Sequence, residues 1–316
     1  MKIFITRDIP DIAKTILREH GYTVSVFKED RPIKKEELIA KGKNADAIIP
    51  LLTDKIDKEV IDELKKCKVI ANYAVGFNNI DIAYAKSKGI VVTNTPDVLT
   101  HATADLAMTL ILACARNVVP GDKMVRQNKF TGWMPKLLLG IELRGKTVGI
   151  IGAGRIGQET AKRAKAFGCE IVYYSKSHKP DFENETGARM VTLDKLLKSS
   201  DVISLHAPLT NKTKHLLNKK KLSLLKHNAI LVNTARGEIV DEKELIKLLR
   251  KKKIFAAGFD VFENEPNVNK ALYELDNVVL LPHVGSATFK ARSDMAELAA
   301  RNVIQVLSSK SPITPV

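Results

Sequence analysis

The sequence predicts an α/β protein built from two doubly wound parallel-sheet domains. Short apolar runs alternate with helix-like segments along most of the chain, and this alternation is typical of parallel strands covered by helices. The alternation falls into two series, which are separated by a long apolar stretch at 102–115. Hydrophobic residues make up 45% of the chain but aromatic residues only 5%, so the cores should be aliphatic, as buried parallel sheets require.

The first series occupies residues 1–99. Gly21, Gly42 and Gly89 follow three of its helical segments, where glycine commonly ends a helix. The expected strands are Lys2–Thr6, Thr23–Phe27, Ala47–Ile49, Val69–Asn72 and Val91–Thr93, and the expected helices are Pro10–His20, Lys34–Lys41, Lys58–Lys65 and Ile80–Lys88. The stretch Ala102–Ala115 then predicts a long buried helix.

A glycine-rich turn opens the second series. The apolar run Val148–Ile151 leads into Gly152-Ala-Gly-Arg-Ile-Gly157, and a helical pattern follows over Gln158–Phe167. In a strand-turn-helix unit of this kind the first glycine permits the turn, the second lets the backbone approach a pyrophosphate, and the third lets helix pack on strand. The free N–H groups of the helix start hold the anion. The motif therefore predicts a Rossmann-like dinucleotide-binding domain.

The rest of the second series alternates in the same way, and the chain ends in one long helical pattern. The expected strands are Glu170–Tyr174, Val202–Leu205, Ile230–Asn233, Ala256–Phe259 and Val278–Leu280, and the expected helices are Leu193–Leu197, Glu242–Lys251 and Thr288–Leu307. No strand is left to pair with the last helix, so it should pack on the first domain. We therefore expect a discontinuous substrate domain, 1–99 plus 287–316, a dinucleotide domain, 100–286, and an interdomain cleft.

Composition narrows the class of protein. The net charge of +15 is spread over lysines along the whole chain and lacks interleaved aromatic residues, so it indicates a solvated surface rather than nucleic-acid binding. Cys67, Cys114 and Cys169 are too scattered for a disulfide framework or a metal site and should be reduced, semi-buried thiols. With no signal peptide pattern and no apolar stretch of membrane-spanning length, we expect a cytoplasmic protein that binds neither membrane nor metal.

Reactive residues follow three later strands, where open α/β sheets bind ligands. Arg236 follows 230–233, Asp260 and Glu265 follow 256–259, and His283 follows 278–280. Each alone has an ordinary structural explanation, such as a surface ion pair, a turn or a satisfied histidine; His20, His178, His206, His215 and His227 are left in that class. Together they indicate a site for 2-oxo acid reduction, which needs a carboxylate anchor, an acid and a partner for that acid.

Seven motifs from residue 72 to 288 carry a resemblance to a known family. They are Asn72-Tyr-Ala-Val-Gly-Phe-Asn-Asn-Ile-Asp81, Asn94-Thr-Pro-Asp97, Ala102-Thr-Ala-Asp-Leu-Ala107, Gly152–Gly157, Asn233-Thr-Ala-Arg-Gly237, Gly258–Pro266 and Pro282-His-Val-Gly-Ser286. Over essentially its whole length the chain resembles the D-isomer-specific 2-hydroxyacid dehydrogenases, most closely their glyoxylate/hydroxypyruvate reductase branch. The resemblance implies hinge closure over a substrate held between two domains.

The resemblance also implies residue roles. His283 is expected to be the general acid, Glu265 its partner, and Arg236 the anchor of the substrate carboxylate, whose other end meets the N–H groups of Val75 and Gly76. Asp260 is expected to orient the nicotinamide carboxamide. Trp133, the only tryptophan, resembles a residue that reaches the neighbouring subunit's site, which implies a homodimer; an ordinary interface aromatic is the alternative. The expected cofactor contacts are Gly152, Ala153, Gly154, Arg155, Ile156, Gly157, Ser175, Lys176, Ser177, Thr234, Ala235, Asp260 and Gly285.

The end of the second strand bears on the choice of cofactor. NAD-preferring members carry a carboxylate near Ser175 for the ribose 2′-hydroxyl. Here Ser175 is followed by Lys176, Ser177, His178 and Lys179, which suit a 2′-phosphate better than a hydroxyl, although a generic basic loop is the alternative. We therefore expect NADP(H) to be favoured, with NAD(H) possible.

The sequence favours an NADPH-preferring reductase of glyoxylate and hydroxypyruvate over several alternatives. Phosphoglycerate, D-lactate and phosphite dehydrogenases share the core motifs, but a phosphite dehydrogenase has a lysine where Val75 stands. A dinucleotide-sensing corepressor would use the same fold, yet such proteins are expected to carry disordered tails that are not visible here. The substrate should be a small anionic 2-oxo or 2-hydroxy acid.

Overall fold

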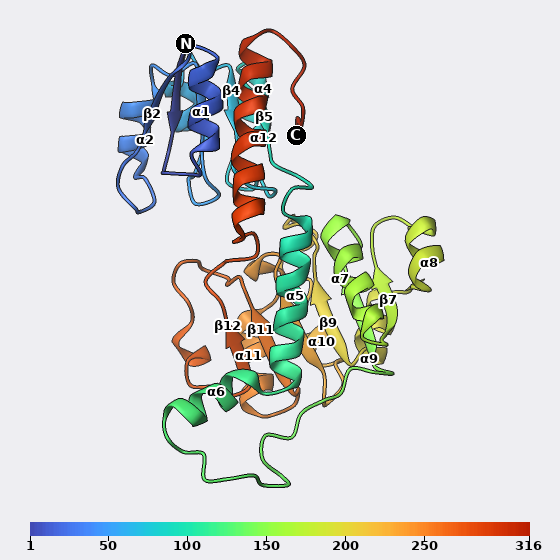
Figure 1. Ribbon diagram of the computed structural model, residues 1–316. Helices are drawn as coiled ribbons and strands as arrows, with labels where there is room; N and C mark the ends of the chain where they lie inside the picture. The colour runs from blue at the N-terminus through green and yellow to red at the C-terminus, as the bar shows by residue number, and fades with distance from the viewer. The chain divides into compact units, whose positions relative to one another are not determined.

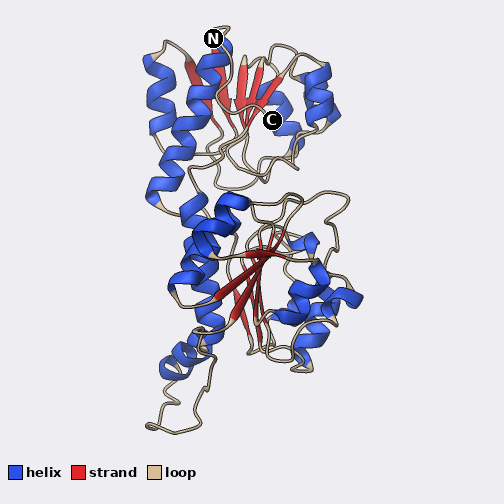
Figure 2. Cartoon of the chain, turned by 90° about the vertical axis from the view of Figure 1, so that its right-hand side faces the viewer, coloured by secondary structure: helices blue, strands red, loops and turns tan.

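A computed structural model describes residues 1–316, which divide into two compact units (Figure 1). The first unit contains Met1–Leu99 and Ser286–Val316, and the second contains Thr100–Gly285. The boundary near the C-terminus lies one residue before the position expected from the sequence. Both units have parallel sheets, and helices cover both faces of each sheet (Figure 2). The doubly wound α/β class predicted from the alternating pattern is confirmed.

The sheet of the first unit has five parallel strands in the order β2-β1-β3-β4-β5. This is the flavodoxin-like order, in which the chain starts in the interior of the sheet and reverses its direction of winding once. The strands are β1 (Lys2–Ile5), β2 (Thr23–Val26), β3 (Ala47–Ile49), β4 (Val69–Ala71) and β5 (Val91–Thr93). β3 and β4 are buried throughout, which explains why they contain only aliphatic residues.

Five helices belong to the first unit, and the last comes from the far end of the chain. They are α1 (Ile12–Glu19), α2 (Lys35–Gly42), α3 (Lys58–Glu63), α4 (Ile82–Ser87) and α12 (Phe289–Leu307). α12 packs on α1 and on β3, β4 and β5. Val316 donates its N–H to the carbonyl of Val92, so the C-terminal segment also contacts the sheet edge. The last helix therefore covers the first sheet, as the absence of a strand partner predicts.

The sheet of the second unit has seven parallel strands in the order β12-β11-β10-β9-β6-β7-β8. Counted from β6, the order is that of a Rossmann fold with one added edge strand, and the winding reverses between β6 and β9. The strands are β6 (Thr147–Ile151), β7 (Glu170–Tyr174), β8 (Arg189–Met190), β9 (Val202–Leu205), β10 (Ile230–Asn233), β11 (Ala256–Phe259) and β12 (Val278–Leu280).

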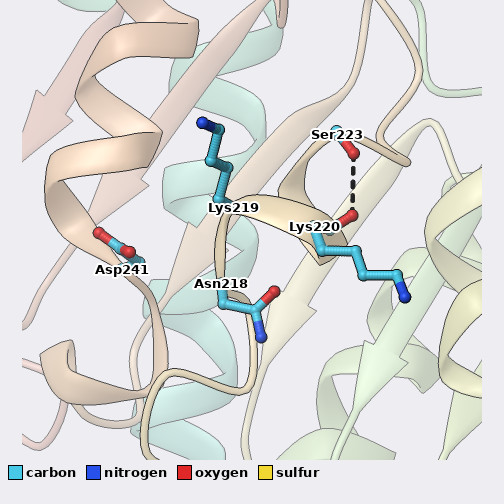
Figure 3. A pocket seen from close by; sticks show the side chains of 5 residues that line it. All are labelled: Asn218, Lys219, Lys220, Ser223 and Asp241. Carbon is cyan, nitrogen blue, oxygen red and sulfur yellow. Dashed lines mark hydrogen bonds between the residues drawn. The ribbon is translucent and has the colours of Figure 1, made fainter.

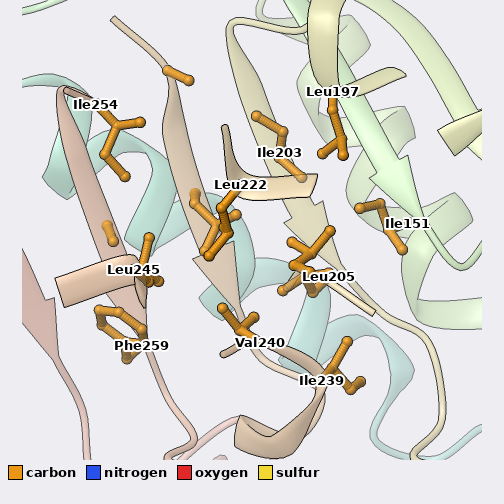
Figure 4. Close-up of a cluster of buried hydrophobic side chains, with 14 of the residues drawn as sticks. Ile151, Leu197, Ile203, Leu205, Leu222, Ile239, Val240, Leu245, Ile254 and Phe259 are labelled. Carbon is orange, nitrogen blue, oxygen red and sulfur yellow. The ribbon is translucent and has the colours of Figure 1, made fainter. Parts of the chain in front are cut away.

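Helices cover this sheet in two layers. α5 (Thr100–Ala115) and α7 (Arg155–Ala166) pack together on one face, and nine of the 16 residues of α5 are buried. α9 (Leu193–Ser199), α10 (Lys219–Leu222) and α11 (Glu242–Arg250) cover the other. There, side chains such as Leu197, Leu222 and Leu245 enclose an aliphatic core with Phe259 at one end (Figure 4).

Several elements were not predicted from the sequence. They are α6 (Val118–Arg126), α8 (Pro180–Thr186), α10, β8 and two 3₁₀ turns at Gly237–Ile239 and Lys270–Leu272. α7 also begins at Arg155, earlier than the helical pattern at 158 indicates, because the glycine motif itself forms its first turn. The three cysteines are free and buried rather than semi-buried. No single helix could cross a membrane, although α5 and α6, bent by 66°, pass a length and composition test as a pair.

Candidate active site

The glycine motif forms a tight turn between β6 and α7. Gly152 has a φ of +97°, and a Cβ atom there would lie 2.6 Å from the backbone nitrogen of Ala207. A Cβ at Gly157 would lie 2.2 Å from the carbonyl oxygen of Gly152, so the backbone of α7 packs directly against the backbone of the turn at this position. A Cβ at Gly154 would have no atom within 4 Å. The first and third glycines are therefore needed for packing, and the middle one exposes backbone to a ligand.

The surroundings of this turn fit a dinucleotide. The turn follows β6, next to β9, where the winding of the sheet reverses, which is the position at which doubly wound sheets bind nucleotides. α7 begins at Arg155, so its first N–H groups, which have no partner within the helix, face the turn. Thr234 Oγ1 and His206 Nδ1, at the ends of neighbouring strands, are buried without a hydrogen-bond partner. Such orphaned polar atoms suit a ligand that supplies the missing partner.

His283 and Glu265 form a pair beyond the ends of β12 and β11. His283 Nδ1 lies 2.7 Å from Glu265 Oε2, and the N–H of Phe262 donates to Glu265 Oε1 at 3.0 Å. His283 has a φ of +55°, a left-handed backbone conformation that is uncommon for residues other than glycine. Because Nδ1 faces the carboxylate, Nε2 is the nitrogen left to meet a substrate.

The charge of Glu265 is set by two opposing effects. Partial burial favours the protonated carboxyl group, but the hydrogen bond and charge of His283, the N–H of Phe262 and the charge of Arg236 outweigh it, so the pKa of Glu265 is lowered. Glu265 is therefore ionised at neutral pH and stabilises a protonated His283. The structure brings together the acid and the partner that the sequence predicts.

Asp260 holds the turn that carries His283. Its side chain is almost fully buried, and its two oxygens accept the N–H groups of Val284 and Gly285, each at 2.7 Å. Burial raises the pKa of this carboxyl group, and these two hydrogen bonds oppose that rise. The structure thus gives Asp260 a positioning role that was not predicted. The contact of Asp260 with a nicotinamide carboxamide stays a prediction. Thr103 on α5 packs against Gly285, next to the Asp260 carboxylate.

Arg236 lies in a loop fixed by two residues that the sequence analysis did not single out. Asn233 donates from Nδ2 to the carbonyl of Arg236 and accepts the N–H of Ala235 on Oδ1. A Cβ at Gly237 would lie 1.9 Å from the carbonyl carbon of Phe262, so only glycine lets this loop meet the one that carries Glu265. Arg236 is partly buried, and burial lowers its pKa, although the charges of Glu265 and Glu238 oppose this. The spacing Asn233-x-x-x-Gly237 is the sequence signal that could have indicated the roles of Asn233 and Gly237 in fixing this loop.

The other expected site residues lie at the ends of β7 and β4. Ser175 is partly buried, whereas Lys176 and Ser177 are exposed beyond β7. In the first unit, the carbonyls of Val75 and Gly76 accept hydrogen bonds from the side chains of Asn94 and Asn72, both at 2.8 Å. These asparagines fix the conformation of the 75–76 loop. The part of that loop in substrate binding stays a prediction.

A surface pocket beside α10 is distinct from these strand ends. It is lined by Asn218, Lys219, Lys220, Ser223 and Asp241 (Figure 3). Asn218 accepts the N–H of Lys221 and Asp241 accepts that of Glu244, so both side chains cap helices. The polar groups of this pocket are therefore used in local structure.

The fold and the site define a class of protein. A Rossmann domain whose glycine turn is open at Gly154, with a histidine–carboxylate pair at the ends of the same sheet, is the arrangement of a nicotinamide-dependent dehydrogenase. Residues 108–285 match the NAD binding domain of the D-isomer specific 2-hydroxyacid dehydrogenases, and this chain belongs to that family.

Individual relatives agree over the full length. The glyoxylate reductase of Pyrococcus furiosus is 51% identical, with 100% of this chain and 95% of the relative covered, and that of Thermococcus litoralis is 50% identical, with 98% and 95% covered. Among solved structures, the TT0316 protein from Thermus thermophilus superimposes with a TM-score of 0.95 at 45% identity, covering 100% of both chains. The NADPH-dependent glyoxylate/hydroxypyruvate reductase of Sinorhizobium meliloti, in complex with NADP and malonate, gives a TM-score of 0.88 at 34% identity, covering 100% and 96%.

Proposed function

We propose that this protein reduces glyoxylate and hydroxypyruvate to the corresponding 2-hydroxy acids with NADPH, and that His283 is the general acid. The observation that carries the proposal is the 2.7 Å pair between His283 and Glu265 at the strand ends of the dinucleotide domain. The names of the full-length relatives, glyoxylate reductases at about half identity, support the choice of substrate.

Residues of this chain have separate roles in the proposed reaction. A bound nicotinamide supplies hydride to the carbonyl carbon of the substrate. Arg236 holds the substrate carboxylate with charged hydrogen bonds and polarises the carbonyl. As negative charge develops on the carbonyl oxygen, His283 donates the proton on Nε2 to that oxygen, and the ionised Glu265 stabilises the imidazolium until transfer. The Val284 and Gly285 N–H groups, held by Asp260, keep the ring in place.

The preference for NADPH rests on the end of β7. No carboxylate occupies position 175 or the four positions after it, where a serine, two lysines, a second serine and a histidine stand. These side chains donate hydrogen bonds or carry positive charge, which favours a 2′-phosphate. A Ser175→Asp variant should therefore lose affinity for NADPH much more than for NADH. An equal loss for both cofactors would contradict this part of the proposal.

We further propose a homodimer that forms through an apolar segment at 118–139. None of the residues of α6 is buried, and the segment after it exposes Phe130, Met134, Leu139 and 85% of Trp133. Exposed apolar surface of this kind marks a protein–protein interface. Light scattering on the purified protein should give twice the chain mass, and a Trp133→Ala, Leu139→Ser variant should shift it toward the monomer.

Initial rates test the reaction itself. Glyoxylate, hydroxypyruvate, pyruvate and phosphohydroxypyruvate are each assayed with NADPH and with NADH. Fast oxidation of NADPH with the first two substrates is the expected result. Tight dinucleotide binding without turnover of any of the four would overturn the proposal and favour a dinucleotide-sensing protein.

A further inference from the structure

The segment 175–179, which follows β7, is held at its C-terminal end by a hydrogen bond to the hydroxyl of Tyr173. Tyr173 belongs to β7, its side chain is fully buried, and its ring meets that of Phe182 edge-on at 5.4 Å between centroids. The N–H of Lys179 donates to the Tyr173 hydroxyl at 2.9 Å. At the near end, the carbonyl of Tyr174 accepts the N–H of Gly152 at 2.8 Å. The residues between Tyr174 and Lys179 are therefore held at both ends by hydrogen bonds.

Glu183 on α8 completes this arrangement. Its Oε1 accepts the hydroxyl proton of Tyr173 at 2.9 Å and the N–H of Met190 in β8 at 3.1 Å. Its Oε2 lies 2.8 Å from Nε2 of His178. One carboxylate therefore joins β7, the edge strand β8 and the exposed segment that contains His178.

The carboxylate is held in its charged form. Burial favours protonation of Glu183, but His178, Tyr173 and the N–H of Met190 outweigh it and lower the pKa. The negative charge of Glu183 is directed at His178 and at hydrogen-bond donors of the scaffold. Lys176 and Ser177, which lie between the fixed ends, are exposed to solvent. A dianionic group could bind there without facing an unpaired acid.

We propose that Tyr173 and Glu183 are positioning residues for cofactor specificity: they hold the 175–179 segment in the conformation that receives the 2′-phosphate of NADPH. The inference rests on the proposed preference for NADPH and explains how that preference is built. A flexible lysine-rich loop would lose side-chain and backbone entropy on binding the phosphate, whereas a fixed loop has lost it already on folding. NADH has no 2′-phosphate, so its binding should depend little on this arrangement.

Three variants and one matched control test the proposal. Tyr173→Phe removes only the hydroxyl from a buried ring, so the fold is kept. Glu183→Ala removes the carboxylate, and Glu183→Gln retains an oxygen that can still accept from Tyr173. The control is Glu185→Ala on the same helix, which breaks an exposed ion pair with Lys162 that lies outside the segment.

The expected result is a selective effect on the KM of NADPH. Loss of the hydrogen bonds that position the segment should raise this KM by about 3- to 10-fold in Tyr173→Phe and Glu183→Ala, with kcat and the KM of NADH changed by less than about 2-fold. Glu183→Gln should recover part of the loss, and the control should match the wild type. Equal changes for both cofactors, or none in Tyr173→Phe, would overturn the inference while leaving a wild-type preference for NADPH intact. A wild type without that preference would overturn the proposed cofactor and this inference together.

Discussion

Replacing Glu265 by glutamine tests the central pair of the site. The substitution keeps the size of the side chain but removes the charge that faces His283 Nδ1 at 2.7 Å. A hydrogen bond to a charged group contributes about 1.5–3 kcal/mol, which corresponds to a loss of roughly 10- to 150-fold in kcat/KM.

The chain offers a matched control in the same loop. Glu263 lies 2.7 Å from His215 Nε2, so Glu263→Gln breaks a pair of the same geometry that does not include His283. The assay is the initial rate as a function of substrate concentration, with a saturating cofactor, for the wild type and both variants. The control should stay within about 2-fold of the wild type. If the two variants lose the same fraction of kcat/KM, the pair acts only through loop structure and the reasoning is refuted.

Three further perturbations address the rest of the site. Arg236→Ala removes the carboxylate anchor and should lower kcat/KM by about 10²–10³, as expected for two charged hydrogen bonds; an unchanged value would place the anchor elsewhere. Asp260→Asn turns one acceptor of the Val284 and Gly285 N–H groups into a donor, so thermal unfolding should show a loss of about 2–4 kcal/mol together with reduced kcat. Burial lowers the pKa of His206 from 6.5 to about 3. Only the unfolded chain binds this proton between those values, so the free energy of unfolding should fall by up to about 1.4 kcal/mol per unit as pH falls, and a His206→Gln variant should show a shallower slope in acid denaturation.

The fold could be predicted because its signals are local. The alternating apolar segments indicate where strands and helices lie, and the glycine turn indicates the position of the nucleotide crevice. The structure has strands at the positions that these patterns predict. α8 and β8 were missed because they have too few apolar residues to show a period: Phe182 is the only large apolar side chain in α8, and both residues of β8 are exposed. These elements are held by contacts with β7, which no local pattern reveals.

The same distinction applies to the site. The placement of Arg236, Glu265 and His283 at one edge of the sheet could be predicted because each follows a strand of the same parallel sheet, and the carboxyl ends of such strands meet at one edge. Their roles in the reaction stay predictions. The part that Asp260 plays in holding the His283 turn could not be predicted, because it depends on the direction of a buried side chain after β11. Nor could the contact of Gly237 with Phe262, which joins residues of two different loops.

The discontinuous first unit has a consequence for biosynthesis. α12 covers β3, β4 and β5, yet it is translated only after the whole of the second unit. At ribosomal rates of about 5–20 residues per second, the first 99 residues wait roughly 10–40 s for the helix that covers their sheet. During that interval the aliphatic face of the nascent first domain is a surface for chaperones or for aggregation, while the second domain contains all of its own core and can fold as soon as it leaves the ribosome.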